Sequence, residues 1–210
     1  MRRLLAALVL ILVAGGALFA VFGSGPSEAQ TAAPAAPRTA VAVLASGCFW
    51  CTESDFDHVA GVISTTSGYS GGRLRNPTYE QVSAGNSGHL ESVRIVYDPA
   101  RVSYARLVDH LFRTSDPTDA GGSFCDRGHQ YRSAIFVRTP EERRIAEAAK
   151  ARVERQLGRP VATLILPAAP FYAAEDYHQD YYRKNPVRYR FYRWNCGRDQ
   201  RIRELWSRAR

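Results

Sequence analysis

The stretch AVAVLASGCFWC, residues 40 to 51, decides the start of the fold, because an apolar run passes directly into two thiols and two large aromatic rings. Residues 40–45 predict a β-strand, and residues 52–60 predict a helix, since Phe49, Phe56 and Val59 recur at roughly helical spacing. A cysteine at such a turn lies near unpaired backbone N–H groups and the positive end of the helix dipole. This position favours the thiolate, the nucleophilic form of Cys48. The competing interpretation is a buried packing cluster, since Cys and aromatic side chains are common in cores.

The first 39 residues lack the pattern of a folded domain. Arg2 and Arg3 precede 19 uncharged, mostly apolar residues (4–22), and residues 23–37 are rich in Gly, Ser, Pro and Ala. This order is typical of an export signal, and the apolar run is also about long enough to span a bilayer. We therefore expect a signal peptide or N-terminal membrane anchor at 1–29, a linker at 30–39 and a folded domain at 40–210. The protein is expected in the periplasm or cell envelope, either soluble after cleavage behind Ala29 or held by the anchor.

Arginine supplies nearly all of the positive charge. The formal net charge is +8 at pH 7, and the excess collects after Arg183, where arginines alternate with tyrosines and Trp194. Such a pattern can bind nucleic acid, or its arginines can stack on aromatic rings and pair with carboxylates. Export argues against a nucleic-acid partner, so we expect the second role.

Strand and helix signals alternate along residues 40–210 without an internal repeat. Further strands are predicted at 62–66, 93–97, 133–137 and 162–166, and further helices follow the N-cap residues Ser103 and Thr139 or occupy 172–184. Pro186 is expected to end the last helix and leave an irregular C-terminal tail. This order fits a single α/β domain with a two-layer sandwich architecture, which we expect to be a monomer. Two loops, 68–88 and 116–130, are longer than connectors need, which is typical of functional loops.

Four polar residues lie at loop and strand junctions around these loops: Tyr79, Glu91, Asp126 and Tyr131. Together with a thiolate they form a coherent chemical set. The thiolate attacks, a carboxylic acid delivers a proton, and phenols donate hydrogen bonds to a developing oxyanion. Spacing alone does not bring these residues together, and each taken singly is more often a packing or surface residue.

Five motifs occur in one order: GCFW, SGYSGG with NPTYEQV, GHLESVRIVYDP, FCDRGHQYRSAIF and AEDYHQDYYRKNP. Together they resemble peptide methionine sulfoxide reductase of the A type, over about residues 40–200. The resemblance implies a ferredoxin-like α/β sandwich. It also implies reduction of the S epimer of methionine sulfoxide, either free or in oxidised proteins.

The resemblance assigns a role to each matching position. Cys48 matches the nucleophile, and Phe49 and Trp50 match the wall that receives the methyl group of the substrate. Glu91 matches the acid. Its pKa must then lie well above the ordinary value of about 4.3, which requires burial. Attack by Cys48 on the sulfoxide gives methionine and a sulfenic acid on Cys48.

Other matching positions assist the nucleophile and the acid. The resemblance makes Tyr79 and Tyr131 the phenols that bind the sulfoxide oxygen and makes Asp126 a supporting carboxylate. His89 and His178 also lie in the motifs, and we expect both to be structural.

The cysteines depart from the usual family pattern. Cys51 follows GCFW where many members have Gly, and Cys125 precedes Asp126 where many have Asn. A sulfenic acid must be condensed with a thiol to reset the enzyme. Cys196 is the first choice for this resolving role, because Gly197 can loosen its tail. Cys51 is the second choice, both can act in a relay, and Cys125 is either a spare or a buried thiol.

The resemblance implies a thioredoxin-like thiol donor as reductant, with no prosthetic cofactor and no metal. Two rival hypotheses remain. In one, Cys48, Cys51, Cys125 and His129 bind a structural zinc ion, since their spacing suits ligation. In the other, Cys48 and Cys51 form a thioredoxin-type thiol–disulfide oxidoreductase. That alternative lacks a Pro between the cysteines and leaves Tyr79 and Glu91 unexplained.

Overall fold

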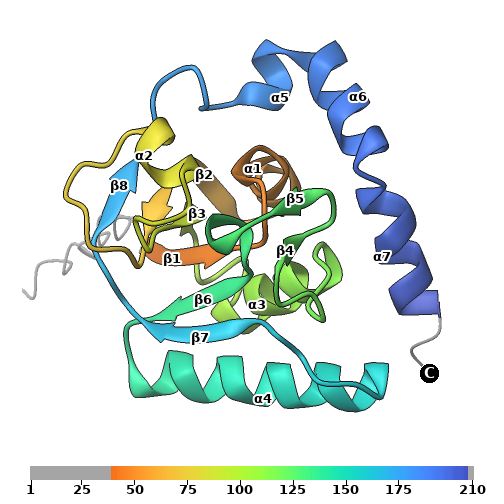
Figure 1. Cartoon of the computed structure of the whole chain (residues 1–210). Coiled ribbons are helices and arrows are strands. Elements are labelled where there is room, and N and C mark those ends of the chain that lie inside the picture. Colours follow the sequence, from red (N-terminus) through yellow and green to blue (C-terminus); the bar gives the residue numbers. More distant parts are fainter. Residues whose placement is uncertain (1–38, 208–210) are drawn as a thin grey trace, which may run out of the picture. The chain divides into compact units, whose positions relative to one another are not determined.

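A six-stranded sheet forms the framework of the protein in a computed structural model, which describes residues 39–207 (Figure 1). The strand order is β7-β6-β1-β3-β2-β8, and every pairing is antiparallel except that of β6 with β7. The strands are β1 (Ala40–Ala45), β2 (Val62–Ser70), β3 (Leu90–Tyr97), β6 (Ala134–Val137), β7 (Leu164–Pro167) and β8 (Phe171–Ala173), with a separate two-stranded ribbon of β4 (Gly122–Ser123) and β5 (Asp126–Arg127). The predicted signal or anchor at 1–29 lies outside the described residues, as does nearly all of the predicted linker at 30–39.

Seven α-helices and one 3₁₀ turn are described around this sheet. They are α1 (Phe49–Asp57), α2 (Tyr79–Ser83), α3 (Tyr104–Arg113), α4 (Pro140–Leu157), α5 (Tyr181–Lys184), α6 (Pro186–Asn195), α7 (Arg198–Ser207) and η1 (His129–Tyr131). The prediction of one mixed α/β domain is confirmed. Within residues 39–207, every helix is too short or too polar to cross a bilayer.

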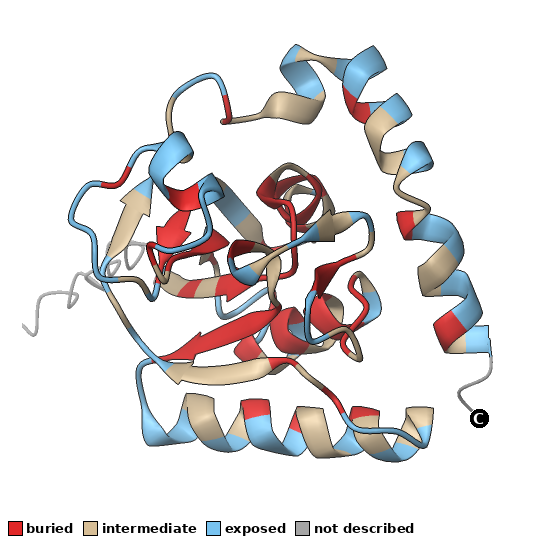
Figure 2. Cartoon of the chain, in the orientation of Figure 1, coloured by how far each residue is buried: buried red, intermediate tan, exposed pale blue. Residues whose placement is uncertain are grey.

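The central strands alternate their side chains between two cores, as strand geometry requires. Leu44 of β1 belongs to the larger core together with apolar residues of α1, α3 and α4. Its neighbour Ala45 packs with Leu90 and Phe136 in a smaller core on the other face. Buried residues therefore concentrate in the sheet and α1 (Figure 2). The larger core fixes α1 against the sheet.

The predicted helix caps are confirmed. Ser103 accepts a hydrogen bond from the Arg106 backbone N–H at the start of α3, and Thr139 accepts one from Glu142 at the start of α4. Gly158 ends α4 in the left-handed conformation that glycine favours.

Two predicted boundaries need correction at positions that matter for chemistry. Helix α1 begins at Phe49 rather than Thr52, because the Cys48 carbonyl accepts from the N–H groups of Cys51 and Thr52. Strand β3 begins at Leu90, so Glu91 lies inside the strand opposite Tyr69 of β2 rather than before it. Pairing with the long strand β2 extends β3, and the sequence pattern does not reveal this partner.

The C-terminal prediction was wrong. Residues predicted to form a helix at 172–184 begin in strand β8, which pairs with Ser70 and Gly68 at the sheet edge. Helix α5 ends at Lys184, before Pro186 as predicted, but Pro186 then starts α6, since proline fits the first turn. The predicted irregular tail forms α6 and α7, which follow one another along one side of the domain (Figure 1). Ion pairs such as that of Arg193 with Asp55, at 2.8 Å, hold these helices.

Candidate active site

The turn before α1 presents Cys48 at the start of a helix. Gly47 has φ +90°, and a side chain there would place its Cβ 2.4 Å from Ser123 Cβ. Only glycine fits this conformation and this close approach. Cys48 is the N-cap of α1 and is 6% exposed. The positive end of the α1 dipole therefore faces the Cys48 thiol.

Glu91 lies next to this helix start. Its Oε2 accepts a hydrogen bond from the Phe49 backbone N–H at 2.9 Å, and the residue is buried. Burial raises the pKa of Glu91 from its ordinary value of 4.5 to about 8, although the Phe49 hydrogen bond opposes the shift. The Glu91 carboxyl is therefore protonated at neutral pH and can act as an acid.

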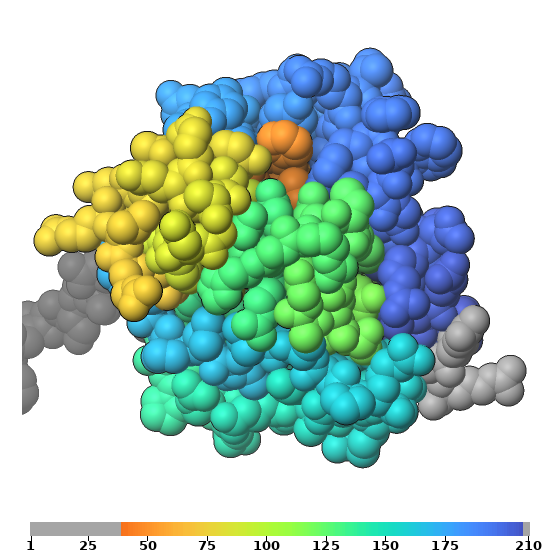
Figure 3. Space-filling model, viewed as in Figure 1, coloured from red at the N-terminus to blue at the C-terminus, as the bar shows by residue number. Residues whose placement is uncertain are grey.

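A cavity of about 120 Å³ opens over Cys48 and Glu91. Seven of its eight lining residues are predicted site residues; they are Cys48, Phe49, Trp50, Tyr79, Glu91, Asp126 and Tyr131, joined by Tyr192. The segment carrying α1, orange in Figure 3, is visible only in a hollow between the yellow, green and blue segments. The structure thus brings together residues from six elements around one small pocket.

Aromatic residues build one wall of the pocket. The Trp50 ring stacks on Tyr181 with centroids 3.7 Å apart, and its Nε1–H donates to His178 Nδ1 at 3.0 Å. The Phe49 ring lies 4.9 Å from the buried His178 ring. His178 thus contacts both members of the predicted methyl-binding wall. His89 is also buried, and its Nδ1 accepts from the Gly72 N–H at 3.2 Å.

Tyr79 and Tyr131 reach the pocket from opposite loops. Tyr79 opens α2 and is held by Glu175, which accepts from its backbone N–H at 2.8 Å. Tyr131 closes the turn η1. Burial raises the pKa of both phenols, and nearby Glu91 adds to the shift. Both side chains therefore stay protonated and can donate hydrogen bonds.

Tyr192 is the pocket residue that sequence analysis missed. Its hydroxyl donates to Asp126 Oδ2 at 2.5 Å, which joins α6 to the ribbon that carries Asp126. Burial raises the pKa of Asp126. The available signal was weak, because Tyr192 is one of several tyrosines among arginines and nothing local marks its distant partner.

Cys51 lies in the first turn of α1, three residues after Cys48. It is buried, and its backbone N–H donates to the Cys48 carbonyl at 3.1 Å. Burial raises the pKa of Cys48 well above its ordinary range, and the neighbouring Cys51 thiol adds to this. The Cys48 thiol lowers the pKa of Cys51, with help from Arg198 and Arg193.

Cys125 and Cys196 form a disulfide with Cα atoms 4.9 Å apart. Cys125 is exposed, so it is neither a spare nor a buried thiol as predicted. Among residues 39–207, the one set close enough to share a metal ion is Cys125, Asp126 and Cys196, and two of these are bonded to each other. The hypothetical zinc site of Cys48, Cys51, Cys125 and His129 is therefore not assembled.

The profile of the family described as peptide methionine sulfoxide reductase matches residues 40–210. The chain belongs to this family. Peptide methionine sulfoxide reductase MsrA 2 of Rhizobium meliloti is 53% identical over 166 residues, 79% of this chain and 83% of that protein. A protein of the same name from Caulobacter vibrioides is 48% identical over 198 residues, 94% of this chain and 98% of its own length.

Solved structures agree with this assignment. Mxr1 of Saccharomyces cerevisiae in reduced form has a TM-score of 0.68 and 30% identity, over 71% of this chain and 87% of that chain. The same yeast protein in complex with Trx2 has a TM-score of 0.51 and 24% identity, over 72% of this chain and 91% of that chain. Peptide methionine sulfoxide reductases of this type reduce the S epimer of methionine sulfoxide. They draw electrons from a thioredoxin-like donor rather than from a prosthetic group.

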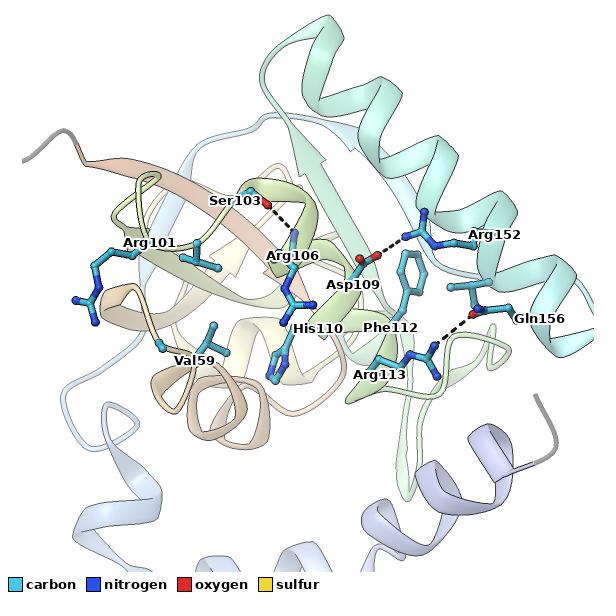
Figure 4. Close-up of a pocket in the computed structure, with 13 residues that line it drawn as sticks. Val59, Arg101, Ser103, Arg106, Asp109, His110, Phe112, Arg113, Arg152 and Gln156 are labelled. Carbon is cyan, nitrogen blue, oxygen red and sulfur yellow. Dashed lines mark hydrogen bonds and ion pairs between the residues drawn. The ribbon is translucent and has the colours of Figure 1, made fainter. Parts of the chain in front are cut away.

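A larger cavity of about 540 Å³ lies away from the reductase pocket, between α3, α4 and the end of α1 (Figure 4). Arginines dominate its walls: Arg101, Arg106, Arg113 and Arg152, with Arg152 paired to Asp109. No thiol lines it. Cavity size alone would therefore misplace the chemistry of this reductase.

Proposed function

We propose that Cys48 is the nucleophile and Glu91 the acid of methionine sulfoxide reduction in this chain. The observation that carries the proposal is the convergence of both residues with two phenols and an aromatic wall around one pocket. As the Cys48 sulfur attacks, Glu91 protonates the sulfoxide oxygen, which is otherwise a poor leaving group. The oxygen passes to Cys48, whose sulfur is oxidised by two electrons to sulfenic acid, while the sulfoxide is reduced to methionine.

Tyr79 and Tyr131 bind the substrate oxygen in this proposal, and Asp126, which accepts from the Tyr192 hydroxyl, is the supporting carboxylate. Both phenols are protonated donors that line the pocket. Such donors gain strength as negative charge develops on oxygen in a water-poor site. Phe49 and Trp50 hold the methyl group, because a small apolar recess disfavours a polar substituent at that place.

Resolution begins with Cys51 in this proposal, which revises the sequence-based preference for Cys196. Cys51 lies three residues after Cys48 in the first turn of α1, and its backbone N–H donates to the Cys48 carbonyl at 3.1 Å, whereas Cys196 is already bonded to Cys125. The Cys51 thiol condenses with the Cys48 sulfenic acid to form a disulfide and release water. Thiol–disulfide exchange then passes the oxidation to Cys196 and on to Cys125.

The described state fits the last stage of this cycle. Cys48 and Cys51 are free thiols, while Cys125 and Cys196 hold the disulfide. A thioredoxin-like dithiol reduces that disulfide by two electrons and becomes oxidised itself. Oxidised proteins and free methionine sulfoxide are the proposed substrates.

Trapping the intermediate tests this scheme. In the Cys51→Ser/Cys196→Ser chain, one equivalent of S-sulfoxide should give one methionine and a stable sulfenic acid at Cys48. Dimedone labelling and peptide mass mapping locate it. Methionine formation with label at Cys125, or with no label, would contradict the proposal. Mapping of disulfides after one turnover of the unaltered chain then identifies the resolving thiol.

We further propose a ferredoxin-like two-layer architecture, export to the periplasm or cell envelope, and a monomeric state. The strand order β6-β1-β3-β2 with α1 and α3 as crossovers supports the first, because it follows the split βαβ pattern. The basic and then apolar N-terminus supports export, ending in either cleavage or a membrane anchor. Mass measurement of the chain recovered from the envelope fraction tests cleavage, and light scattering tests the monomer.

A further inference from the structure

The pocket that contains Cys48 and Glu91 is too small to hold more than the end of a substrate side chain. Its volume is about 120 Å³, whereas sites that enclose a whole drug-sized ligand span roughly 300–1,000 Å³. A methionine sulfoxide within a protein continues into polypeptide on both sides of its side chain. This polypeptide must therefore lie on the surface around the pocket mouth, where its contacts decide how tightly it is held.

One turn of the chain connects the pocket to the surface beside it. The turn is closed by a hydrogen bond from the His178 backbone N–H to the Glu175 carbonyl at 2.9 Å. His178 is buried, and its ring centroid lies 4.6 Å from that of Tyr79 and 5.7 Å from that of Trp50, which both line the pocket. Tyr177 is 54% exposed, and its ring centroid lies 4.2 Å from that of His178. Aromatic surface thus continues outward from the pocket wall to Tyr177.

A larger, open cavity adjoins the pocket on the side of Glu175. Its volume is about 460 Å³, and it is lined by residues 76–78, by the three residues of β8 and by Glu175. Glu175 joins the two cavities, because its Oε1 accepts from the backbone N–H of the pocket residue Tyr79 at 2.8 Å. We call the larger cavity the β8 groove. A chain that leaves the pocket past Tyr79 therefore meets this groove next.

Strand β8 gives the β8 groove a free strand edge. It is the last strand in the order of the six-stranded sheet, and among residues 39–207 it pairs with β2 alone (Figure 1). Backbone groups on the free side of an edge strand can bind an extended polypeptide. Such backbone hydrogen bonds need no particular sequence, which suits an enzyme that meets methionine sulfoxide in many proteins.

We propose that Tyr177 and the β8 groove form a subsite for the polypeptide next to a methionine sulfoxide, so that extended peptides bind more tightly than the free amino acid. This inference rests on the proposed function of the pocket. The sulfoxide side chain enters the pocket, a neighbouring substrate residue packs on the exposed Tyr177 ring, and the chain beyond it runs in extended form into the groove. Tyr177 and β8 touch no reacting atom in this scheme and act on substrate selection alone.

Single-turnover assays with two substrates test the inference on the full chain. The substrates are free methionine S-sulfoxide and an extended peptide with a central S-sulfoxide flanked by leucines. The concentration that gives half-maximal methionine formation is measured for each, and it should be lower for the peptide. Tyr177→Ala should raise this concentration about fivefold for the peptide, the size of one aromatic contact, and less than about twofold for the free amino acid. Tyr177→Phe should keep the wild-type value, because the ring makes the contact.

Two further variants separate the groove from the rest of the surface. Ala173→Lys places a long charged side chain in the β8 groove, which Ala173 lines as an exposed residue, and it should weaken the peptide alone. It also replaces Tyr177→Ala if that variant fails to fold. Ile63→Ala is the matched control and should change neither substrate. Ile63 is 53% exposed, but it lies about 20 Å along β2 from Tyr69, whose ring contacts Phe49.

The outcomes are separable. A peptide that binds the wild-type chain no better than the free amino acid overturns the inference, as does an unchanged peptide value in both Tyr177→Ala and Ala173→Lys. A Tyr177→Ala chain that loses only thioredoxin-driven turnover also overturns it, because Tyr177 would then contact the reductant. Turnover of either sulfoxide by Cys48→Ser contradicts the proposed function instead, whatever the two substrates show.

Discussion

The four cysteines of this reductase lie in two environments, with Cys48 and Cys51 as buried free thiols and Cys125 bonded to Cys196. The first pair lies at the start of α1, with 6% and 1% exposure. The second joins an exposed loop residue to the end of α6. A protected pocket suits reaction with sulfoxide, whereas an accessible sulfur suits exchange with another protein. One site cannot be both buried and accessible. The two cysteine pairs meet these requirements at separate places.

Removing Cys48, the proposed nucleophile, should have the largest effect. Cys48→Ser is expected to abolish methionine formation, a loss of more than about a thousandfold, because serine cannot form the sulfenic acid. Chromatographic measurement of methionine from the S-sulfoxide checks this. The disulfide of Cys125 and Cys196 should still form in this variant. Retained turnover would show that the pair Cys125 and Cys196 can attack the sulfoxide by itself.

Removing Glu91, the proposed acid, tests whether burial of this carboxyl matters for the reaction. Glu91→Gln should lower kcat about a hundredfold, in the usual range for loss of a general acid. The pKa of Glu91 is about 8. The protonated form is therefore present below that value, and wild-type kcat should fall as pH rises through it. The pH profile of kcat measures both effects.

The Glu91→Gln profile should lack the alkaline fall. Glu53→Gln is the matched control, because Glu53 is also buried on α1 but accepts from the Asp180 N–H at 2.9 Å. A profile for Glu91→Gln that still falls near pH 8 would assign the acid elsewhere.

Removing the disulfide of Cys125 with Cys196 should affect recycling alone. Cys196→Ser is expected to lower thioredoxin-driven turnover more than about tenfold, because a buried Cys48–Cys51 disulfide is poorly accessible. One methionine per chain should still form in a single turnover. Cys125→Ser should behave alike, and dithiothreitol should partly replace thioredoxin in both variants. Full thioredoxin-driven turnover in both would mean that the buried pair is reduced directly.

The smallest effect is expected at the contact between Gly47, next to Cys48, and Ser123, near Cys125. Gly47→Ala should destabilise the domain by about 1–3 kcal/mol, because Gly47 has φ +90° and abuts Ser123, two residues before Cys125. Gly158→Ala is the matched control. Its φ is +62°, but nothing lies within 4 Å of the added Cβ. Denaturant unfolding should give a larger loss for Gly47→Ala, and equal losses would exclude a steric role for Ser123.

Local patterns predicted the parts of the fold that depend on local physics. The apolar strand at 40–45 and the caps Ser103 and Thr139 are read directly from residue type. The helices α6 and α7 were missed because no continuous apolar stripe marks them. Their arginines instead bind carboxylates far along the chain, as Arg193 binds Asp55. Propensity does not reveal such tertiary partners.

The site was predictable where motifs carried it and unpredictable where distant pairing did. Tyr79, Glu91, Asp126 and Tyr131 all line the pocket with Cys48, as the motif resemblance implied. Tyr192 and Arg198 were missed, because their partners Asp126 and Asp55 lie more than 60 residues away. The pairing of Cys125 with Cys196 likewise depends on how the C-terminal helices fold back.

The hydrogen bond from the Phe49 backbone N–H to Glu91 gives the protein an internal reporter. A carboxylate accepts from an amide more strongly than a carboxylic acid does. The amide proton resonance of Phe49 therefore follows the protonation of Glu91, although the amide itself takes no part in the reaction. An NMR experiment on a single backbone nitrogen can thus follow the Glu91 proton through the catalytic cycle without altering any side chain.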